Sequence, residues 1–520
     1  MNEQLHPITN APGGASRFAP VIQAVKIHAE ALRAIPGVFG VRPGFRIVGG
    51  ELTEEPAIIV VTRPGEATGK IQAEIDGLPV QVRQANPQEI VEGLSPLSVW
   101  EGFLPEAVPL INYTPPNPSE VTLAETCVGH ITCHVGPDSG WTTLKPFLEG
   151  TTTSLTVAMY EFYANHIIET VTRLGENSQA KLKMILQVSS NDETIKTTLN
   201  KSWGNRLDFV RASVSGPNRI FNNSYHTKVA VRDSCAFWLS SGNWSPNSQP
   251  LIEPGAEQML YKIGNREWHV IIEDEPLAQM YEKFINYDMR LARAAGEPEA
   301  APEMPDLLIP DAWPEPEAAV IQDHPFVAKT FAASGDPIRV KPLMSPDNYA
   351  KEILELIQNA ESSLYLQFSY IRQPSTEKFD EIITAIANKM KDNLDVRVLV
   401  GSNQAPEHSE LLIGQRGWKR SMFRRQTSKV HNKGILIDGK VAVVGSNNWS
   451  SDGTQYNRDS SLVFFSEPIA QYFTEVFLYD WDNLSKPIGS SPETSPVLAP
   501  ESGLTPPGMV RIPWQAWYDE

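Results

Sequence analysis

The sequence has few cysteines, no long apolar run and no excess of positive charge, and each absence excludes a class of protein. Three cysteines in 520 residues are too few for the disulfide framework of a small secreted domain. They indicate a reducing compartment, either as free thiols or with Cys127 paired to Cys133 across a turn. The longest apolar runs, such as 57–61 and 441–444, are far too short to span a bilayer.

The charge balance is acidic. Aspartate and glutamate outnumber lysine and arginine by 62 to 44, which gives a formal charge of −18. Because phosphate contacts depend on Lys and Arg, this balance argues against a protein that coats nucleic acid non-specifically, while a local basic cleft stays possible. The first residues lack a basic start followed by an apolar stretch, so no cleaved secretory signal is visible. We expect a cytoplasmic protein, or one exported without a cleaved signal peptide.

The chain nevertheless holds enough apolar residues, 41%, for the two to four domains that its length predicts. Residues 1–18 are a polar segment that predicts a flexible tail. Residues 19–92 predict a small α+β domain of unknown role, with one helix followed by three strands. Residues 93–121 are rich in proline and predict a linker.

The remainder of the chain shows a duplication. Helices and strands alternate in the same order in 122–293 and in 326–485, which predicts two α/β units. The Pro/Glu/Ala-rich segment 294–325 cannot bury a core and predicts a linker or surface strap between them. A Pro-rich tail, 486–520, follows, and it has enough aromatic surface to dock back onto the body through Trp514, Trp517 and Tyr518.

Each half carries the same polar motif at the same spacing. The pattern is His-x-Lys, four residues, an Asp, and then a Ser and an Asn after the next short strand. Its two copies are His226, Lys228, Asp233, Ser241 and Asn243, and His431, Lys433, Asp438, Ser446 and Asn448. Residues two apart on a strand project from one face, so we expect the His and Lys of each copy to point into one cavity.

This set of side chains suits chemistry on a phosphodiester. A neutral imidazole is a nucleophile, and lysine stabilises the non-bridging phosphate oxygens. Ser241, Ser446 and the two asparagines are placed to donate hydrogen bonds to the same oxygens. Zinc is the competing explanation, but structural zinc sites use Cys and His at short spacing, and here the near neighbours are lysines that repel a cation. We therefore expect no metal and no cofactor.

The duplicated motif resembles the signature of the phospholipase D superfamily, His-x-Lys-x4-Asp-x6-Gly-Ser-x-Asn. The second copy matches at every position, whereas the first has Ser240 in place of the Gly, and Gly242 at the variable place. The resemblance covers roughly 122–485 and implies a pseudo-two-fold pair of α/β sandwich halves with the site between them. It also implies a two-step displacement through a phosphohistidine, with His226 as the nucleophile and His431 as the acid and base.

The resemblance further implies that a carboxylate late in each half orients a histidine. In the second half the candidate is Asp459, which ends an Asn-Arg-Asp triplet; in the first half it is Glu257. Asp233 and Asp438 precede turns, and the resemblance implies that they are more structural than chemical.

Two features bear on the substrate. The segment 415–433 is basic throughout and leads into His431, so it is either a solvated face or a region that attracts an anionic substrate, with Arg424 and Arg425 as candidate contacts. Trp244 and Trp449 follow the two motif asparagines. Their rings would line an entrance for acyl chains, stack on a base, or pack in the core.

Three functions follow from these observations. The first is a phospholipase D that hydrolyses glycerophospholipids at a membrane or micelle surface and also transfers the phosphatidyl group to alcohols. The second is an endonuclease of the same superfamily that cleaves DNA or RNA, and the third is a non-catalytic binding protein with this fold. Two complete motifs argue against the third, and the acidic balance favours lipid over nucleic acid. Since one chain holds both halves, we expect a monomer.

Overall fold

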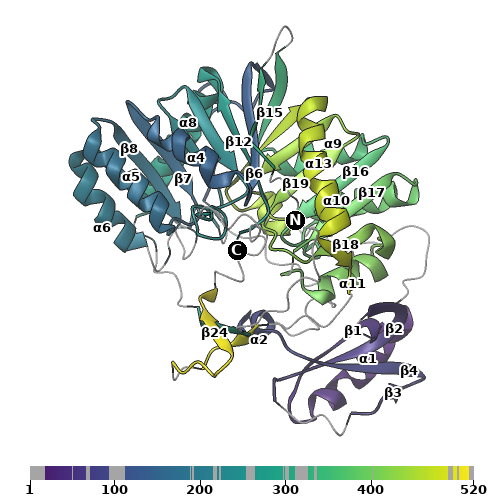
Figure 1. The fold of residues 1–520 in the computed structure, drawn as a ribbon. Helices are drawn as coiled ribbons and strands as arrows, with labels where there is room; N and C mark the ends of the chain where they lie inside the picture. Colours follow the sequence, from purple (N-terminus) through teal and green to yellow (C-terminus); the bar gives the residue numbers. More distant parts are fainter. Residues whose placement is uncertain are drawn as a thin grey trace, which may run out of the picture.

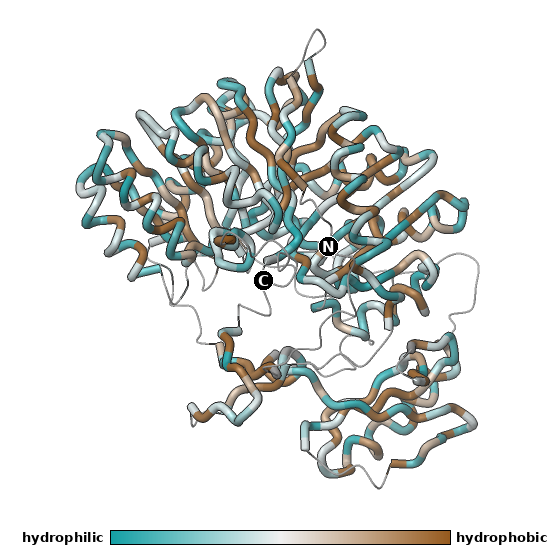
Figure 2. The backbone as a smooth tube through the Cα atoms, in the orientation of Figure 1, coloured by the Kyte–Doolittle hydropathy of each residue, from teal (hydrophilic) through white to brown (hydrophobic). Residues whose placement is uncertain are grey.

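The computed structural model consists of two large sheets covered by helices, with two smaller sheets beside them (Figure 1). It describes residues 18–49, 51–65, 71–92, 112–187, 189, 192–212, 214, 219–221, 224–252, 264–296, 298, 304–310, 326–332, 337–401, 403–489, 496–500 and 503–514. Figure 2 shows that apolar segments run through the large sheets, while the covering helices alternate between apolar and polar residues.

The N-terminal domain packs one helix on a sheet with the strand order β1-β2-β4-β3. Its elements are α1 (Ala19–Arg33), β1 (Val38–Val48), β2 (Glu51–Thr62), β3 (Glu74–Ile75), β4 (Leu78–Gln84) and α2 (Pro87–Glu92). Helix α1 begins with a proline in its first turn and buries one apolar face, as its spacing predicts. Arg42 of this sheet forms a buried ion pair with Glu410, so the domain is docked on the second half of the chain.

The first large sheet has the order β14-β6-β12-β11-β10-β7-β8-β9. Its strands are β6 (His130–Gly136), β7 (Ser154–Met159), β8 (Lys181–Gln187), β9 (Leu207–Ala212), β10 (Val229–Arg232), β11 (Ala236–Ser240), β12 (Glu267–Glu273) and β14 (Lys329–Ala332). The associated helices are α4 (Gly140–Glu149), α5 (Asn165–Asn177), α6 (Asp192–Trp203), η1 (Gly204–Arg206) and α8 (Glu275–Ala295).

The second large sheet has the order β22-β18-β17-β16-β19-β20-β21-β15-β5. Its strands are β5 (Thr126–Val128), β15 (Ile338–Ser345), β16 (Ser363–Phe368), β17 (Asp395–Val400), β18 (Phe423–Gln426), β19 (Lys433–Ile437), β20 (Val441–Gly445), β21 (Asp459–Phe465) and β22 (Ser485–Pro487). The helices are α9 (Tyr349–Gln358), α10 (Glu377–Lys391), α11 (Pro406–Gly414), η3 (Arg420–Met422), α12 (Ser451–Gln455) and α13 (Glu467–Asn483).

The two sheets repeat one topology and share a core. In each sheet, the strand after the His-x-Lys pair, β10 or β19, has two antiparallel neighbours. One is its hairpin partner, β11 or β20. The other, β7 or β16, pairs in parallel with the next strand of the sheet. One hydrophobic cluster contains residues of β10–β12, β20, β21, α8 and α13, so it joins the halves. The expected pseudo-two-fold α/β fold with a small α+β domain in front is therefore confirmed.

The halves are less separate in the sequence than their expected boundaries suggest. Strand β5, which precedes the first sheet in the chain, pairs with β15 at the edge of the second sheet. Strand β14, from the start of the second half, pairs with β6 at the edge of the first sheet. Each exchange adds a strand to an otherwise unpaired edge, which removes backbone groups from solvent.

The segment expected to be a linker supplies a strand. Strand β13 (Leu307–Pro310) lies between β23 (Val497–Leu498) and β24 (Met509–Ile512) of the C-terminal tail, and Leu307 packs against the buried Trp514. Trp517 and Tyr518 lie outside the described residues.

All three cysteines are free thiols. In the described part of the chain, we find no helix whose length and apolar character would let it cross a membrane.

Candidate active site

The two motif histidines meet at the interface between the large sheets. Each precedes a central strand, His226 before β10 and His431 before β19, and their ring centroids are 6.3 Å apart. Both are almost completely buried, with 1% of their surface exposed. The backbone N–H of each donates to a carbonyl of the opposite half: His226 to Arg458 at 2.7 Å, and His431 to Arg266 at 3.1 Å.

The two arginines that supply these carbonyls tie the halves together. The guanidinium of Arg266 binds Asp480 of α13 in the other half, at 2.8 Å. The guanidinium of Arg458 binds Asp288 of α8, again across the interface and again at 2.8 Å. A second aspartate binds each guanidinium at 2.6 Å, Asp138 for Arg266 and Asp347 for Arg458. Because these pairs are buried and multiply hydrogen-bonded, they fix the position of the two histidine backbones.

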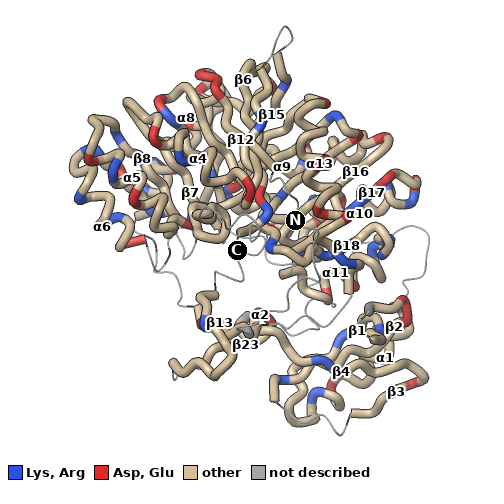
Figure 3. The backbone as a smooth tube through the Cα atoms, in the orientation of Figure 1, with Lys and Arg blue, Asp and Glu red and all other residues tan. Residues whose placement is uncertain are grey.

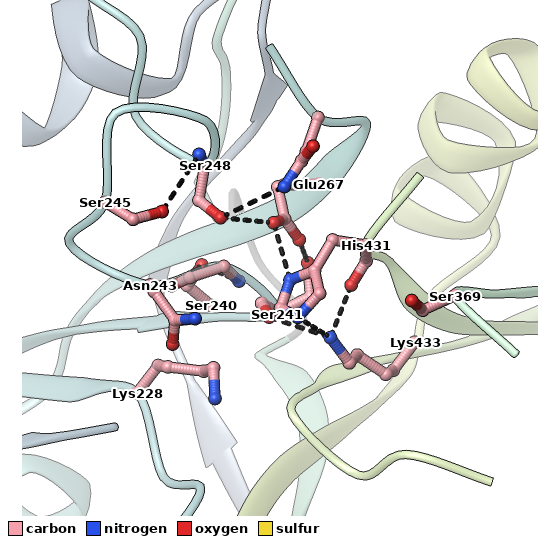
Figure 4. A network of polar contacts seen from close by, with 12 residues as sticks. Lys228, Ser240, Ser241, Asn243, Ser245, Ser248, Glu267, Ser369, His431 and Lys433 are labelled. Atoms are coloured by element: carbon pink, nitrogen blue, oxygen red, sulfur yellow. Dashed lines mark hydrogen bonds and ion pairs between the residues drawn. The ribbon is translucent and has the colours of Figure 1, made fainter. Parts of the chain in front are cut away.

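A carboxylate from the opposite half orients each histidine. Asp459 Oδ1 lies 2.7 Å from His226 Nδ1. Glu267 Oε1 lies 2.8 Å from His431 Nδ1 (Figure 4). Each carboxylate begins a strand, β21 for Asp459 and β12 for Glu267. With Nδ1 engaged in this way, Nε2 is the nitrogen of each ring that is left for chemistry.

Glu267 is the carboxylate of the first half that contacts a histidine in the described structure. Glu257 lies outside the described residues, whereas Glu267 is hydrogen-bonded to the histidine. The strand registers show that Glu267 is equivalent to Asp459. Ser240 pairs with His269, and the equivalent Gly445 pairs with Ser461; each carboxylate lies two residues before the paired residue. Spacing along the chain concealed this equivalence, because the first half has a longer segment before the strand. A sequence signal was present, since Glu267 ends an Asn-Arg-Glu triplet that parallels the Asn-Arg-Asp of the second half.

Hydroxyl groups hold the two carboxylates in place. Ser446 Oγ donates to Asp459 Oδ1 at 2.8 Å. Ser241 Oγ donates to Glu267 Oε2, and Ser248 Oγ donates to Glu267 Oε1 at 2.8 Å. The two motif serines, expected to contact substrate, are thus engaged with the carboxylates in this structure. Glu267 has three hydrogen-bonded partners, whereas Asp459 Oδ2 is buried without one among the described residues.

This difference in partners makes the two halves electrostatically unequal. Burial raises the pKa of Asp459 to about 7, against the opposing effects of Lys228 and the Ser446 hydrogen bond. Burial also opposes ionisation of Glu267, but the charge and hydrogen bond of His431 lower its pKa to about 2. Burial, reinforced by the positive charge of Lys228, lowers the pKa of His226 well below its ordinary value. His226 is therefore held as a neutral imidazole.

The two motif lysines lie beside the histidines in different ways. Lys433 Nζ lies 2.6 Å from Nε2 of His431 and 2.6 Å from its carbonyl oxygen. Lys228 Nζ donates to the carbonyl oxygen of His226 at 2.8 Å and lies over the ring of Tyr160. Nε2 of His226 is buried and has no hydrogen-bond partner in the described part of the chain. Of the two reactive nitrogens, only that of His226 is unoccupied among the described residues.

The motif asparagines also differ. Asn243 donates through Nδ2 to Glu161 Oε2 at 3.2 Å. Asn448 is buried, and its Oδ1 has no partner among the described residues.

The departure of the first motif from the family pattern has a local cause. Ser240 Oγ is hydrogen-bonded to His269 Nδ1 at 2.6 Å. At position 242, a Cβ would lie 2.7 Å from the Glu267 side chain, so glycine is the residue that fits there without displacing that side chain.

Asp233 and Asp438 bind backbone rather than the reactive groups. Asp233 accepts from three consecutive N–H groups, those of residues 152–154, and Asp438 accepts from those of residues 361–363. Although burial acts in the opposite direction, these hydrogen bonds lower the pKa of both carboxyls. Both residues have left-handed backbone angles, φ 52° and 55°, which aspartate tolerates in a turn.

Trp244 and Trp449 are core residues, which corrects the expectation that they bind substrate. Both side chains are fully buried; Trp244 packs edge-to-face on Phe162, and Trp449 lies 4.2 Å from the ring of Phe368. Since protein covers both rings, neither offers a face for an acyl chain or a base.

The basic segment is partly engaged within the protein. Figure 3 shows Lys and Arg gathered near β18. Arg416 forms an ion pair with Asp380 at 2.8 Å. Arg424 donates to Ser485 at 2.7 Å and lies over the ring of Trp481, and Arg425 follows it on β18, opposite Val400. Arg416 and Arg424 thus have structural contacts, and substrate binding by Arg424 and Arg425 stays a prediction.

Comparison with known proteins agrees with the motifs. Residues 353–481 match a family model described as "Cardiolipin synthase, PLD-like domain". This match lies on the second half and includes the complete motif. The match identifies a phospholipase D-like domain in the second half, in agreement with the superfamily that the motifs resemble.

Three solved structures illustrate the similarity. Phosphatidylserine synthase of Haemophilus influenzae is 12% identical with a TM-score of 0.49, and the alignment covers 71% of this chain and 90% of that one. Polyphosphate kinase of Porphyromonas gingivalis is 10% identical with a TM-score of 0.40, over 67% and 50%. Nuc, a phospholipase D family member of Salmonella typhimurium, is 19% identical with a TM-score of 0.24, over 28% and 95%. No curated protein matches the chain.

Proposed function

We propose that this protein is a metal-independent phospholipase D, which hydrolyses glycerophospholipids through a phosphohistidine on His226. The observation that carries the proposal is the pair of buried imidazoles, 6.3 Å apart, each oriented by a carboxylate from the opposite half. Two lysines lie beside them and supply the positive charge that a phosphodiester needs. These groups suffice for the reaction without a bound metal.

In the first step, Nε2 of His226 attacks phosphorus and the bond between phosphorus and the head-group oxygen breaks. Asp459 holds the Nδ1 proton of His226 in place and stabilises the positive charge that develops on the ring. His431 donates a proton to the departing oxygen, supported by the Glu267 carboxylate. Lys433 leaves Nε2 of His431 for a phosphate oxygen when the substrate enters. The freed Nε2 takes up a proton from solvent, so His431 begins the step as an imidazolium.

In the second step, water attacks the phosphorus of the phosphohistidine. His431, now neutral, takes the proton of this water as the bond between phosphorus and Nε2 of His226 breaks. The products are phosphatidic acid and the free head-group alcohol, and the enzyme returns to its starting protonation state. An alcohol that replaces water in this step receives the phosphatidyl group instead.

A lipid substrate is favoured over a polynucleotide for two reasons. The chain carries a formal charge of −18, which opposes the backbone of a nucleic acid, and two arginines of the basic segment already have contacts within the protein. The matching family model is described by a phospholipid enzyme, cardiolipin synthase.

We also propose that the protein acts as a monomer on a membrane or micelle surface, because one chain supplies both histidines. Its free thiols fit the cytoplasm or another reducing compartment.

The test is a paired assay of the full-length protein in EDTA. One arm measures choline release from phosphatidylcholine vesicles, and the other measures nicking of supercoiled DNA. His226→Ala is the inactive variant, and His130→Ala, which removes a half-exposed histidine outside the site, is the matched control. We expect choline release by the wild type and the control variant, and none by His226→Ala.

Each other outcome contradicts a stated part of the proposal. DNA nicking without choline release would identify an endonuclease. Activity that disappears in EDTA would exclude the metal-independent mechanism. Absence of both activities would exclude both substrates, and choline release by His226→Ala would exclude the phosphohistidine at this residue.

A further inference from the structure

The two halves of the active site are equivalent position by position, so a difference between them is informative. β7 and β16 are equivalent strands, because each pairs antiparallel with the strand after a His-x-Lys motif and parallel with its other neighbour. β7 ends at Met159 and β16 ends at Phe368. Tyr160 and Ser369 are thus the first residues beyond equivalent strands. The first half has an aromatic ring where the second half has a small hydroxyl side chain.

Tyr160 contacts both members of the first His-x-Lys pair. Its ring centroid lies 4.9 Å from that of His226, with the planes at 63°, and 4.9 Å from Lys228 Nζ. The buried ammonium of Lys228 lies on the face of this ring and donates to the carbonyl oxygen of His226. Nε2 of His226 has no hydrogen-bond partner in the described residues.

The second half has the opposite arrangement. Ser369 accepts a hydrogen bond from Asn403 Nδ2 at 2.8 Å and presents no ring to the lysine. Figure 4 shows Ser369 beside Lys433, with the lysine amine directed at His431. Lys433 Nζ lies 2.6 Å from Nε2 of His431, whereas the same nitrogen of His226 has no partner among the described residues. The two lysines thus differ in their contacts, and the residues beside them at the ends of β7 and β16 differ as well.

We propose that Tyr160 selects the nucleophile, because its ring holds Lys228 away from Nε2 of His226 and leaves that lone pair available. This inference rests on the proposed function and deepens it. A lone pair that accepts a hydrogen bond from an ammonium group cannot attack phosphorus until the ammonium leaves. The histidine whose lysine is already held elsewhere is therefore the one prepared to attack. Tyr160 acts through Lys228, so it is a positioning residue.

The expected effect follows from the strength of the contact. A desolvated ammonium on an aromatic face is stabilised by about 2 kcal/mol, which corresponds to a factor of about thirty in an equilibrium. Loss of the ring should therefore allow Lys228 to occupy Nε2 of His226, as Lys433 occupies that of His431. The site would then approach two-fold symmetry, and both histidines would compete for phosphorus.

Two substitutions at one position test this. Tyr160→Phe keeps the ring face, whereas Tyr160→Ser copies the second half. The full-length variants react in EDTA with bis(4-nitrophenyl) phosphate, a simple phosphodiester, and alkaline quenching followed by peptide mass spectrometry locates the phosphohistidine. We expect phosphate on His226 alone for the wild type and Tyr160→Phe. For Tyr160→Ser, we expect phosphate on both histidines and a fall in kcat/KM of about thirtyfold.

Two results would overturn the role of Tyr160. One is a folded Tyr160→Ser protein, with the wild-type melting temperature, that keeps the wild-type rate and labels His226 alone. The other is a Tyr160→Phe protein that behaves like Tyr160→Ser, which would assign the effect to the hydroxyl and not to the ring. A wild type with turnover but with phosphate only on His431 would overturn the choice of nucleophile and this proposal together.

A measurement without substrate separates this proposal from the proposed function. If the wild type neither turns over nor forms phosphohistidine, the proposed function fails. Long-range ¹H–¹⁵N spectra of protein labelled with ¹⁵N-histidine still report the state of each Nε2. We expect the Nε2 shift of His226 to move toward that of His431 in Tyr160→Ser and to stay in place in Tyr160→Phe. An unchanged His226 shift in Tyr160→Ser would overturn the proposal.

Discussion

The first and second halves of the molecule have the same strand order around the site, yet they place their histidines in different environments. Glu267 receives three hydrogen bonds and has a pKa of about 2, whereas Asp459 has one unpartnered oxygen among the described residues and, through burial, a pKa of about 7. His431 faces the carboxylate of lower pKa and has a lysine at Nε2. His226 faces the carboxylate of higher pKa, and its Nε2 has no partner in the part of the chain that the structure describes. Duplication thus supplies two copies of each group, and small local changes give the copies different environments.

The halves also depend on each other for these environments. Each histidine receives its carboxylate, and the carbonyl that anchors its backbone, from the opposite half. The buried pairs of Arg266 with Asp480 and of Arg458 with Asp288 cross the same interface. A half on its own would have a His-x-Lys pair with no orienting carboxylate. The unit of function is therefore the assembled pair, which explains why both copies lie in one chain here.

The largest effects should come from substitution of the two histidines, and two substrates with different leaving groups should distinguish the variants. In His226→Asn, we expect no reaction with either phosphatidylcholine or bis(4-nitrophenyl) phosphate, because the attacking nitrogen is gone. In His431→Asn, choline release should also stop, since its oxygen needs a proton. Nitrophenolate leaves without one, so this variant should release one equivalent per enzyme and then stop at the phosphohistidine. The measurement is a stopped-flow trace of nitrophenolate absorbance.

The same experiment shows whether the comparison holds. A burst from His226→Asn and none from His431→Asn would reverse the two roles. Identical behaviour of the variants with both substrates would mean that the halves are functionally equivalent despite their different environments.

The two carboxylates should give the next largest effects, again with a different pattern. Glu267→Gln weakens support for the proton donor, so we expect about a 10²- to 10³-fold loss of choline release and a much smaller loss with the nitrophenyl diester. Asp459→Asn disturbs the orientation and tautomer of the nucleophile, so we expect a loss of about 10²-fold with both substrates. The ratio of kcat/KM for the two substrates in each variant is the measurement. Equal ratios in the two variants would contradict the division of roles.

The sequence predicted the elements that depend on local pattern. The two His-x-Lys motifs, the central strands after them and the helix of the N-terminal domain follow from residue spacing over a few positions. The duplicated motif also located both histidines. The resemblance to the phospholipase D superfamily implied Asp459, which ends the Asn-Arg-Asp triplet. What these features share is that neighbours in sequence determine them.

The rest depends on contacts between distant segments. Glu267 was missed because equivalence to Asp459 is set by strand register, and chain spacing differs between the halves. The exchange of β5 and β14 between sheets depends on which edges are unpaired after folding. The docking of the N-terminal domain joins Arg42 to Glu410, partners that no local pattern connects. The sequence did not decide between a core position and a substrate contact for Trp244, because it does not show which way a side chain next to a site points.

The pH dependence of stability should have opposite slopes for the two carboxylates. Glu267 has a folded pKa of about 2, below its ordinary value, so its contribution to stability is complete above about pH 4.3 and is lost as the pH falls. Asp459 has a folded pKa of about 7, above its ordinary value, so its contribution is complete below about pH 3.9 and is lost as the pH rises through 7.

Calorimetric melting temperatures between about pH 3 and pH 8 test this prediction for the two isosteric variants. Relative to the wild type, Glu267→Gln should be destabilised most above about pH 4.3, and the difference should shrink toward acid. Asp459→Asn should gain in relative stability as the pH rises from about 4 to about 7. Each change should amount to a few degrees in Tm. Parallel pH profiles for the two variants would mean that the carboxylates are electrostatically alike.

The smallest effects should come from Asp233 and Asp438, where the halves are alike. Each carboxylate accepts from three consecutive backbone N–H groups, and neither is bonded to a reactive histidine in the described structure. Asparagine tolerates the same left-handed backbone but replaces one acceptor oxygen by a donor that faces these N–H groups. We expect Asp233→Asn and Asp438→Asn each to lower the free energy of unfolding by about 1–3 kcal/mol, with kcat/KM per folded molecule close to that of the wild type. Urea titration and the choline assay measure both quantities. Unequal losses of stability, or a loss of turnover in a variant of wild-type stability, would show that the asymmetry of the site extends to these turns.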